Sequence, residues 1–511
     1  MYSKHTWLPR LGTGLNKFAN SGDAEHLVLT PEPDTLTQEG TPFSATWMNE
    51  LEGGVYKAHQ HLGAVIEEAT AGEALTAGDV IGVCSGTAYK PSDELRAAGS
   101  AVSPNTNARR YFFAPANSNN GLMLNDNKGY TRYRITNGQL QVGATYAFDA
   151  YYYFYYACRL SSDVVLTLRG GNSDYARFAT FRGFTTGDIS TSLTTQVTYW
   201  SNFSGVSSVN NKKFCLDEYS PDNFGNLRAA LAYINSSGKI CLYRLKIPTS
   251  GTDAYTVLPD TSVDVLTFSN AADLCLDRSP SGRELCMIDN AGGDIKLRVL
   301  GSNFVLEFDA DITGWNAQRV RARWISDDAI LVVYADSGSS NALTAKVVVL
   351  NGSTVTSRYS LQIGEALGTI SSELVMPSLY RLQPGVFLLT YTNSSGYTSY
   401  CVMTASDTGA TVGTLRHLSS VISVADGAGS GVFGSRVLLQ TSNTSVAPYD
   451  LALPEAVAAN TTTFGGAVTA VYDGNVYSSD FSKGSDIASA GVKAHAYADG
   501  CLSVMGWWKN T

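Results

Sequence analysis

Charged residues are scarce in this chain, since Lys, Arg, Asp and Glu make up only 16% of its 511 residues. The net charge of −9 argues against a clustered basic surface, which nucleic-acid binders need for phosphate contacts. No apolar run approaches the roughly eighteen residues of a membrane-spanning helix. The first residues also lack the apolar segment of a signal peptide. We therefore expect a protein that is made and folded in a cytoplasm, with neither a nucleic-acid partner nor membrane insertion.

Cysteine is present, but no CxxC or CxH spacing occurs that would indicate a redox or zinc motif. The eight cysteines are Cys84, Cys158, Cys215, Cys241, Cys275, Cys286, Cys401 and Cys501. Most stand in apolar, strand-like phrases, which predicts buried reduced thiols. The alternative is a disulfide between neighbouring strands, and Cys275 and Cys286 are the first pair to check.

Catalytic and metal-binding signals are also missing. There is no Walker A pattern, no Gly-x-Ser-x-Gly elbow and no HExxH. His59 and His61 have no third ligand at a suitable spacing, so no metal or cofactor is expected. Glycoside hydrolysis usually needs two carboxylates, and candidates such as Asp277, Glu284, Asp309 and Asp311 have no distinguishing neighbours. We predict no catalytic residues, although glycan hydrolysis is not excluded.

Gly, Ser, Thr, Asn and Tyr are plentiful, which is typical of short strands joined by tight turns. One strand-turn-strand phrase recurs, as in 122–135 and 388–403, where an apolar strand meets an Asn/Asp/Ser/Gly turn and a second strand follows. Its copies begin at residues 122, 165, 231, 285, 331, 388 and 437. A loose period of about fifty residues is typical of a β-propeller. We predict an all-β fold with a seven-bladed propeller-like body; the alternatives are stacked β-sandwiches or an irregular β assembly.

Composition shifts divide the chain into four parts: an N-terminal arm with short helices (1–65), a small β module and linker (66–104), the propeller-like domain (105–462) and a C-terminal β cap (463–511). The linker interpretation applies to residues 92–105, which are small and polar. The last part contains two predicted hairpins, around Asp473-Gly474 and Asp499-Gly500. These strands either form a separate cap, which we favour, or complete the first blade of the ring.

The first part has a predicted helix beginning near Ser44, a suitable N-cap, and a second short helix over Val55–Glu68. Four apolar side chains would share one face of the first helix and form a docking surface: Phe43, Trp47, Met48 and Leu51.

Two phrases in residues 40–91 resemble proteins of tailed bacteriophages. Gly-Thr-Pro-Phe-Ser-Ala-Thr-Trp-Met-Asn-Glu-Leu-Glu (40–52) is similar to the helical entry of tail-fibre and baseplate proteins. Ala-Thr-Ala-Gly-Glu-Ala-Leu-Thr-Ala-Gly-Asp-Val-Ile (69–81), with Tyr-Lys-Pro after it, is similar to a β module of phage virion proteins. The resemblance implies a virion structural protein that docks through its N-terminal region, and it carries no catalytic residue.

Aromatic residues cluster in Tyr146–Tyr156. Read as one strand, this segment sends Tyr152, Phe154 and Tyr156 to one face and three more tyrosines to the other. Such a strand fits the core, and it also fits a subunit interface or a sugar-stacking surface. Trp507 and Trp508 are too costly to leave in water and are expected to pack on the body or on a neighbouring subunit.

From these observations we expect a virion protein, assembled in the host cytoplasm, that acts as a tail-fibre or receptor-binding component. Its partners would be other virion proteins, a bacterial surface glycan or protein, and further copies of itself. The first alternative is a collar, baseplate or capsid decoration protein that binds only virion proteins. The second is a polysaccharide depolymerase.

Overall fold

The computed structural model describes residues 92–451 with internal gaps. These gaps are 105–109, 118, 126–128, 137–138, 148–151, 172–175, 185–187, 201–213, 220, 235–238, 269–270, 353, 371–373, 428 and 434–435. Outside that range it describes only the short strands β1–β7 and β37–β40. The chain divides into two compact units: one is Met1–Ile81, Gly86–Ala88 and Val457–Thr511, and the other is Gly82–Ser85 and Tyr89–Ala456. In the described part, no helix has the length and apolarity that crossing a membrane requires.

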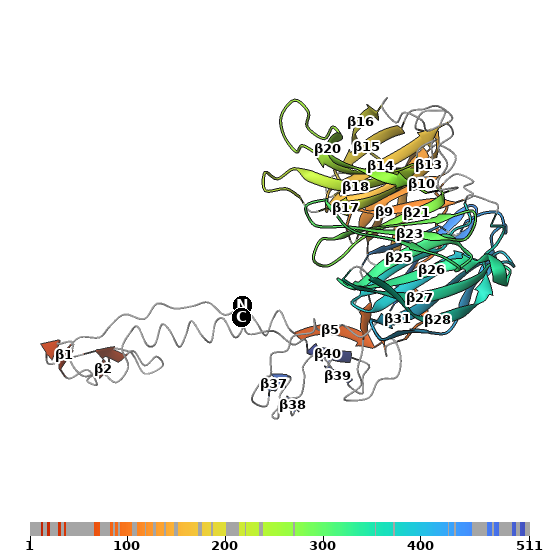
Figure 1. Cartoon of the computed structure of the whole chain (residues 1–511). Coiled ribbons are helices and arrows are strands. Elements are labelled where there is room, and N and C mark those ends of the chain that lie inside the picture. The colour runs from red at the N-terminus through yellow and green to blue at the C-terminus, as the bar shows by residue number, and fades with distance from the viewer. Residues whose placement is uncertain are drawn as a thin grey trace. The chain divides into compact units, whose positions relative to one another are not determined.

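The larger unit contains seven antiparallel sheets, or blades (Figure 1). Blade 1 is β9 (Tyr111–Pro115), β10 (Asn120–Asn125), β11 (Gly129–Thr136) and β12 (Gln139–Ala147). Blade 2 is β13 (Tyr152–Ser161), β14 (Val164–Gly171), β15 (Ala176–Arg182) and β16 (Thr194–Trp200). Blade 3 is β17 (Phe214–Tyr219), β18 (Leu227–Ile234), β19 (Lys239–Ile247) and β20 (Leu258–Thr267). Blade 4 is β21 (Ala271–Arg278), β22 (Glu284–Asn290), β23 (Ile295–Leu300) and β24 (Leu306–Ile312).

Blade 5 is β25 (Ala317–Ser326), β26 (Ala329–Asp336), β27 (Ala342–Asn351) and β28 (Thr354–Ala366), with a 3-10 turn, η1 (Ser337–Ser339), after β26. Blade 6 is β29 (Ser378–Gln383), β30 (Val386–Thr392), β31 (Tyr397–Ser406) and β32 (Gly409–Val412), and β33 (Arg416–Val421) also pairs with β31. Blade 7 is β34 (Ser430–Phe433), β35 (Arg436–Ser442), β36 (Ser445–Leu451) and β8 (Leu95–Ala97).

The first strand of each blade contacts the first strand of the next, and β34 of blade 7 contacts β9 of blade 1. The ring is therefore closed, and the seven first strands surround its centre. This arrangement is a seven-bladed β-propeller, which confirms the fold predicted from the repeated phrase.

Each copy of the repeated phrase lies on the second strand of one blade, followed by the turn to the third strand. In three blades the turn has the same hydrogen bond from a backbone N–H to an asparagine side chain. Asn125 Oδ1 accepts from Gly129, Asn290 Oδ1 from Asp294 and Asn393 Oδ1 from Tyr397, at 2.9, 2.9 and 3.0 Å. An asparagine that mimics a backbone turn explains why these residues mark the repeat.

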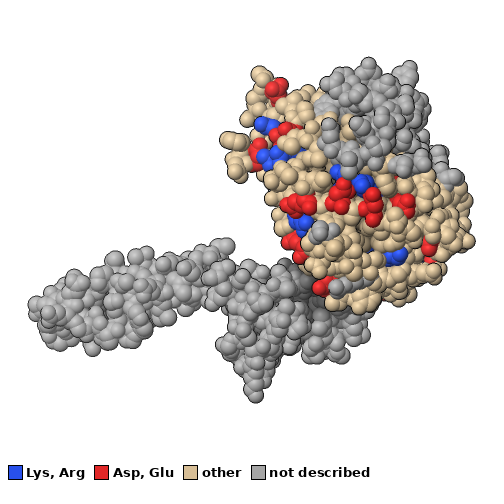
Figure 2. Space-filling model, viewed as in Figure 1, with Lys and Arg blue, Asp and Glu red and all other residues tan. Residues whose placement is uncertain are grey.

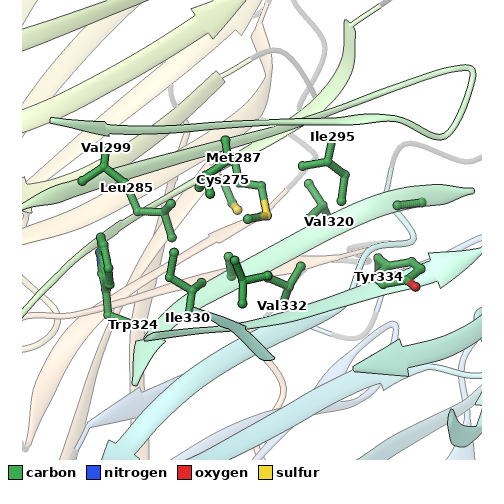
Figure 3. Close-up of a cluster of buried hydrophobic side chains, with 14 of the residues drawn as sticks. Cys275, Leu285, Met287, Ile295, Val299, Val320, Trp324, Ile330, Val332 and Tyr334 are labelled. Carbon is green, nitrogen blue, oxygen red and sulfur yellow. The ribbon is translucent and has the colours of Figure 1, made fainter. Parts of the chain in front are cut away.

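A buried hydrophobic cluster fills each of the seven gaps between adjacent blades. Between blades 4 and 5, Trp324 and Val332 pack against Leu285 and Met287 (Figure 3). Fully burying one such aliphatic side chain contributes roughly 1.5–3 kcal/mol. The stability of the ring therefore comes from the blade interfaces, because a single four-stranded blade cannot bury both of its faces.

The ring is closed by β8, which pairs with β36 through Tyr449↔Ala97, Asp450↔Arg96 and Leu451↔Leu95. A further bridge joins Val102 to Val446. The interpretation of 92–105 as a linker is therefore wrong in part, because Leu95–Ala97 supplies the outermost strand of blade 7. None of the described strands in residues 463–511 belongs to a blade of the ring.

The smaller unit contains the described terminal strands. These are β1 (Gly12–Thr13), β2 (Phe18–Asn20), β3 (Leu29–Pro31), β4 (Thr35–Leu36), β5 (Ile66–Ala71), β7 (Thr87–Tyr89), β37 (Val468–Tyr472), β38 (Asn475–Ser479), β39 (Lys493–Ala496) and β40 (Cys501–Met505), whereas β6 (Gly82–Cys84) is assigned to the larger unit. The two predicted C-terminal hairpins are confirmed as β37–β38 and β39–β40. β40 pairs with β5, so Ile66–Glu68 are in a strand and the predicted second helix does not reach Glu68.

The tyrosine-rich segment is not one strand, because β12 ends at Ala147 and β13 begins at Tyr152 in the next blade. The β13 register also shifts between Tyr152 and Phe154, which breaks the predicted alternation. Tyr156 is half-buried and packs against the core between blades 2 and 3. The side chains of Tyr152 and Phe154 lie outside the described set.

The six cysteines whose side chains are described are free thiols. Cys275 lies opposite Met287 and Cys286 lies opposite Leu276, so the two cysteines face opposite sides of blade 4. They belong to different interblade cores and cannot form a disulfide with each other. Cys158, Cys275, Cys286 and Cys401 are buried, as predicted, whereas Cys215 and Cys241 are half-buried.

Candidate functional site

A cavity of about 520 Å³ lies where the C-terminal ends of the inner strands meet. All seven blades contribute to its lining. The contributing segments are 113–115, 157–159, 216–218, 277–280, Arg323, 380–381 and 431–433. Its volume falls within the range of ligand pockets, and the end of a propeller channel is a concave site on a rigid scaffold. We therefore take this cavity as the candidate binding site.

Asp217 is the carboxylate in the cavity with the fewest protein partners. Its Oδ1 accepts a hydrogen bond from the Glu218 N–H at 2.9 Å, whereas Oδ2 is buried with no partner among the described residues. Burial, assisted by the charge of Asp277, raises the pKa of Asp217 to about 7. This side chain can therefore donate or accept a hydrogen bond near neutral pH.

Asp277, in contrast, is fully engaged by blade 5. Its Oδ2 accepts from the Trp324 N–H at 2.6 Å and its Oδ1 from Arg323 Nη1 at 3.2 Å. Its carbonyl accepts from Trp324 Nε1 at 3.1 Å. Burial raises the pKa of Asp277, and the Arg323 charge opposes that effect. Asp277 and the half-buried Arg323 form an ion pair that joins two inner strands and lines the cavity.

Glu284 lies behind the cavity, on β22 opposite Arg278 in the register. Its side chain is fully buried, and neither carboxyl oxygen has a hydrogen-bond partner among the described residues. Burial, with the charges of Asp217 and Asp277, raises the pKa of Glu284 well above its usual range. Since an unpaired buried charge is costly, the folded structure favours the protonated form of Glu284.

Four arginines also line the cavity: Arg159, Arg278, Arg323 and Arg381. Arg159 pairs with Glu218 at 3.6 Å and lies over the Phe433 ring. Arg381 is exposed, and its side chain has no hydrogen bond or salt bridge among the described residues, although its charge acts on Asp277 and opposes the rise in the pKa of that carboxyl. Charged residues are few on the rest of the described surface in this view, most of which is neither acidic nor basic (Figure 2).

At the opposite ends of the inner strands, arginines are engaged by the protein itself. Arg110 Nη1 donates to the Leu374 carbonyl, Arg319 Nη2 donates to the Ile370 carbonyl, and Arg321 Nη1 lies 3.2 Å from Asp273 Oδ2. Burial lowers the pKa of Arg110 to about 10. The first two contacts hold the segment before β29 against its neighbours, and the third joins β25 to β21, so all three have a structural role.

One further cluster has the residue types of a nucleophilic triad. The Ser399 hydroxyl and His417 Nδ1 are 2.9 Å apart, and His417 Nε2 lies 3.2 Å from Glu365 Oε1. A catalytic serine must be reached by substrate, but Ser399 is fully buried. The cluster therefore joins β33 to β31 and to blade 5 without acting as a catalytic site.

The structure brings together residues that the sequence had not grouped. Of the four carboxylates considered for hydrolysis, Asp277 lines the cavity and Glu284 lies behind it. Asp309 and Asp311 instead lie on the outer strand of blade 4, where they pair with Arg298 and Lys296 at 2.8 and 2.6 Å. Asp217 was missed, because a lone acid within a strand carries no sequence signal.

None of the predicted docking and interface residues is among the described residues that line this cavity. Phe43, Trp47, Met48, Leu51, Trp507 and Trp508 lie outside the described residues. Tyr156 lies on β13 just before the cavity-lining residues Ala157, Cys158 and Arg159. Within the described part of the chain, no group of three or more His, Cys, Asp or Glu is arranged to hold a metal ion.

No protein-family model and no curated protein matches this chain. Among solved structures, the WD40 β-propeller domain of Doa1 is similar over 70% of this chain and 97% of its own, at 8% identity and a TM-score of 0.42. YCF48 bound to D1 peptide is similar over 73% and 97%, at 10% identity and 0.40. The SapL1 lectin in complex with alpha methyl fucoside is similar over 60% and 96%, at 11% identity and 0.37. Similarity at this identity concerns the fold alone.

Proposed function

We propose that this protein is a binding protein whose propeller recognises a polar ligand, a glycan or protein of a bacterial surface, at the central cavity. The observation that carries the proposal is the cavity of about 520 Å³, to which all seven blades contribute side chains. A rigid ring holds these side chains in place before the ligand arrives, which reduces the entropy cost of binding.

We further propose that the protein acts within a virion, as a tail-fibre or receptor-binding component. The support is the resemblance of residues 40–91 to tail-fibre, baseplate and other virion proteins of tailed bacteriophages. The N-terminal region would bind other virion proteins, and several copies would bind the host together. Weak binding at each cavity is then sufficient, because linked copies raise the overall affinity.

The test is binding of the fluorescently labelled protein to bacterial cells, with and without their surface polysaccharide. Pro280 is an exposed residue of the cavity lining, so Pro280→Trp places a large ring at the cavity. Ser250→Trp, on an exposed loop that does not line the cavity, is the matched control. We expect Pro280→Trp to abolish binding and Ser250→Trp to preserve it; equal binding by both variants would show that the cavity is not the site.

Glycan hydrolysis is a second candidate function, favoured by the Asp217 carboxyl. An acid with a pKa near 7 inside a cavity suits protonation of a glycosidic oxygen. The second carboxylate would be Glu218, since both Asp277 oxygens bind protein donors. Reducing ends released from host polysaccharide, and lost in Asp217→Asn, would support this function.

A further inference from the structure

The cavity differs in charge from the rest of the molecule. The chain has a net charge of −9. The cavity, however, is lined by four arginines against three acidic residues, Asp217, Glu218 and Asp277. Burial raises the pKa of one of these acids, Asp217, to about 7, so the negative charge at neutral pH is smaller than the residue count implies. An acidic protein thus has a positive cavity at the centre of its propeller.

We infer that the cavity binds a carboxylate-bearing saccharide, with Arg381 holding the carboxylate and Asp217 holding a hydroxyl group. The inference rests on the proposed binding function and specifies the chemical class of ligand for the same site.

Arg381 is the group available for an anion. Two other arginines of the cavity already have acidic partners, since Arg159 pairs with Glu218 and Arg323 with Asp277. Arg278 lies over the Tyr219 ring, with its guanidinium carbon 5.0 Å from the ring centre. Arg381 alone of the four is exposed, and within the described residues its side chain has no hydrogen bond, salt bridge or ring contact, its charge acting only at longer range on Asp277. A guanidinium binds a carboxylate through two parallel hydrogen bonds, which gives both affinity and orientation.

Asp217 supplies the complementary polar contact. Its Oδ2 is buried without a partner in the described part of the chain. An unsatisfied buried oxygen of this kind costs free energy that a ligand hydroxyl would recover. Because the carboxyl titrates near pH 7, it offers a hydroxyl group either an acceptor or a donor.

The remaining lining fits a sugar ring. Phe113, Tyr380 and Phe433 come from three different blades and are partly exposed. Their rings add apolar area beside the charged groups, a combination typical of small-molecule sites. An acidic peptide also carries carboxylates, but it lacks the rigid, hydroxyl-rich ring that Asp217 and these aromatic side chains would hold together.

The test uses an array of oligosaccharides bearing uronate or sialate groups. Each is matched with its neutral methyl ester, and a glutamate-rich peptide represents the other class of anionic ligand. The full-length protein and two variants are compared. Arg381→Gln removes the exposed guanidinium of the cavity. Arg134→Gln removes one positive charge from β11, outside the cavity lining. Thermal unfolding of each variant establishes that its fold is intact.

We expect the protein to bind acidic saccharides and not their esters. Arg381→Gln should weaken binding by roughly tenfold or more, the usual effect of losing a charged hydrogen bond. Arg134→Gln should stay within about twofold, as expected for a charge outside the site.

Four outcomes would overturn the inference. Equal binding of acids and esters, sensitive to Pro280→Trp, would leave the proposed binding function standing while removing the charge preference. Acid binding unaffected by Arg381→Gln would place the site elsewhere. An array with no saccharide bound would exclude this class, and peptide binding that depends on Arg381 would assign the cavity to a protein ligand.

Discussion

The Asp93 carboxylate binds the Arg416 guanidinium across 323 residues of chain, with Oδ1 2.8 Å from Nη2. Its other oxygen accepts a hydrogen bond from the Thr414 N–H at 2.7 Å. Asp93 stands just before β8, and both of its partners follow β32 of blade 6. The outermost strand of blade 7 is therefore anchored to the neighbouring blade as well as to its own sheet.

Removing this anchor should loosen the closure of the ring. Asp93→Ala leaves Arg416 and the Thr414 N–H without their acceptor, and hydrogen bonds to charged groups contribute roughly 1.5–3 kcal/mol each. We expect the free energy of unfolding, measured by urea denaturation, to fall by about 1–3 kcal/mol. Asp407→Ala removes an exposed aspartate from blade 6 and should change it by less than about 0.5 kcal/mol. Coincident denaturation curves for the two variants would show that the contacts of Asp93 do not contribute to the free energy of unfolding.

The junction between blades 7 and 1 should be sensitive to a single added methyl group. A Cβ at Gly429 would lie 2.2 Å from the Tyr111 carbonyl oxygen, where backbone must move to make room. We expect Gly429→Ala to lower the free energy of unfolding by about 1–3 kcal/mol, as overpacking usually does. Gly409→Ala is the control, because its nearest neighbour, the Tyr359 ring, is at an ordinary 3.5 Å. A Gly429→Ala variant as stable as the control would mean that the junction adapts freely.

The propeller was predictable because each repeat depends on hydrogen bonds between residues that are close together in the sequence. Turn residues such as Asn125, Asn290 and Asn393 accept hydrogen bonds within four residues, so each hairpin appears in the sequence by itself. Closure by Leu95–Ala97 was not predictable, because three residues with no turn signal pair with a strand more than 300 positions away.

The cavity was not predictable from the sequence, because its residues are far apart along the chain. Asp217, Asp277 and Arg323 come from blades 3, 4 and 5, and each is an ordinary strand residue in its own segment. Only the ring brings their side chains together. The aromatic cluster near Tyr152 was recognisable because its residues are consecutive in the sequence. The candidate site is built from single residues of seven blades, so no one segment of the sequence indicates it.

Glu284 should make the protein less stable as the pH rises. Burial raises its pKa well above the usual 4.5, so the folded chain keeps a proton that the unfolded chain has lost. Because the folded state binds more protons, the free energy of unfolding falls with increasing pH, by about 1.4 kcal/mol per pH unit for one proton. The fall begins above the unfolded value and ends at the folded pKa.

Glu284→Gln removes that titrating group, so its stability curve between pH 5.5 and 7 should be shallower than that of the unaltered protein, by at most about 1.4 kcal/mol per pH unit. Urea denaturation at several pH values measures both slopes. The exposed Glu307→Gln controls for loss of a glutamate side chain in the same blade. Parallel curves for Glu284→Gln and the unaltered protein would mean that Glu284 is already ionised in the folded state.

Binding of an acidic saccharide should weaken as Asp217 ionises. Burial raises the pKa of this carboxyl to about 7, so it is largely neutral at pH 6 and largely charged at pH 8. The charged groups that act on it are Asp277, Glu218 and Arg323, and Glu284 lies behind it. If the two groups are about 4 Å apart, full ionisation of Asp217 beside a bound carboxylate costs about 1 kcal/mol even in water, or roughly fivefold in Kd. Because Asp217 is only partly titrated at each end of this pH range, we expect affinity to be roughly threefold higher at pH 6 than at pH 8, and more if the cavity excludes water. Asp217→Asn should flatten the profile, because its side chain cannot ionise.

Isothermal titration at both pH values, with Asp407→Asn as the control, measures the difference. A profile that keeps its slope in Asp217→Asn would assign the pH dependence to another group.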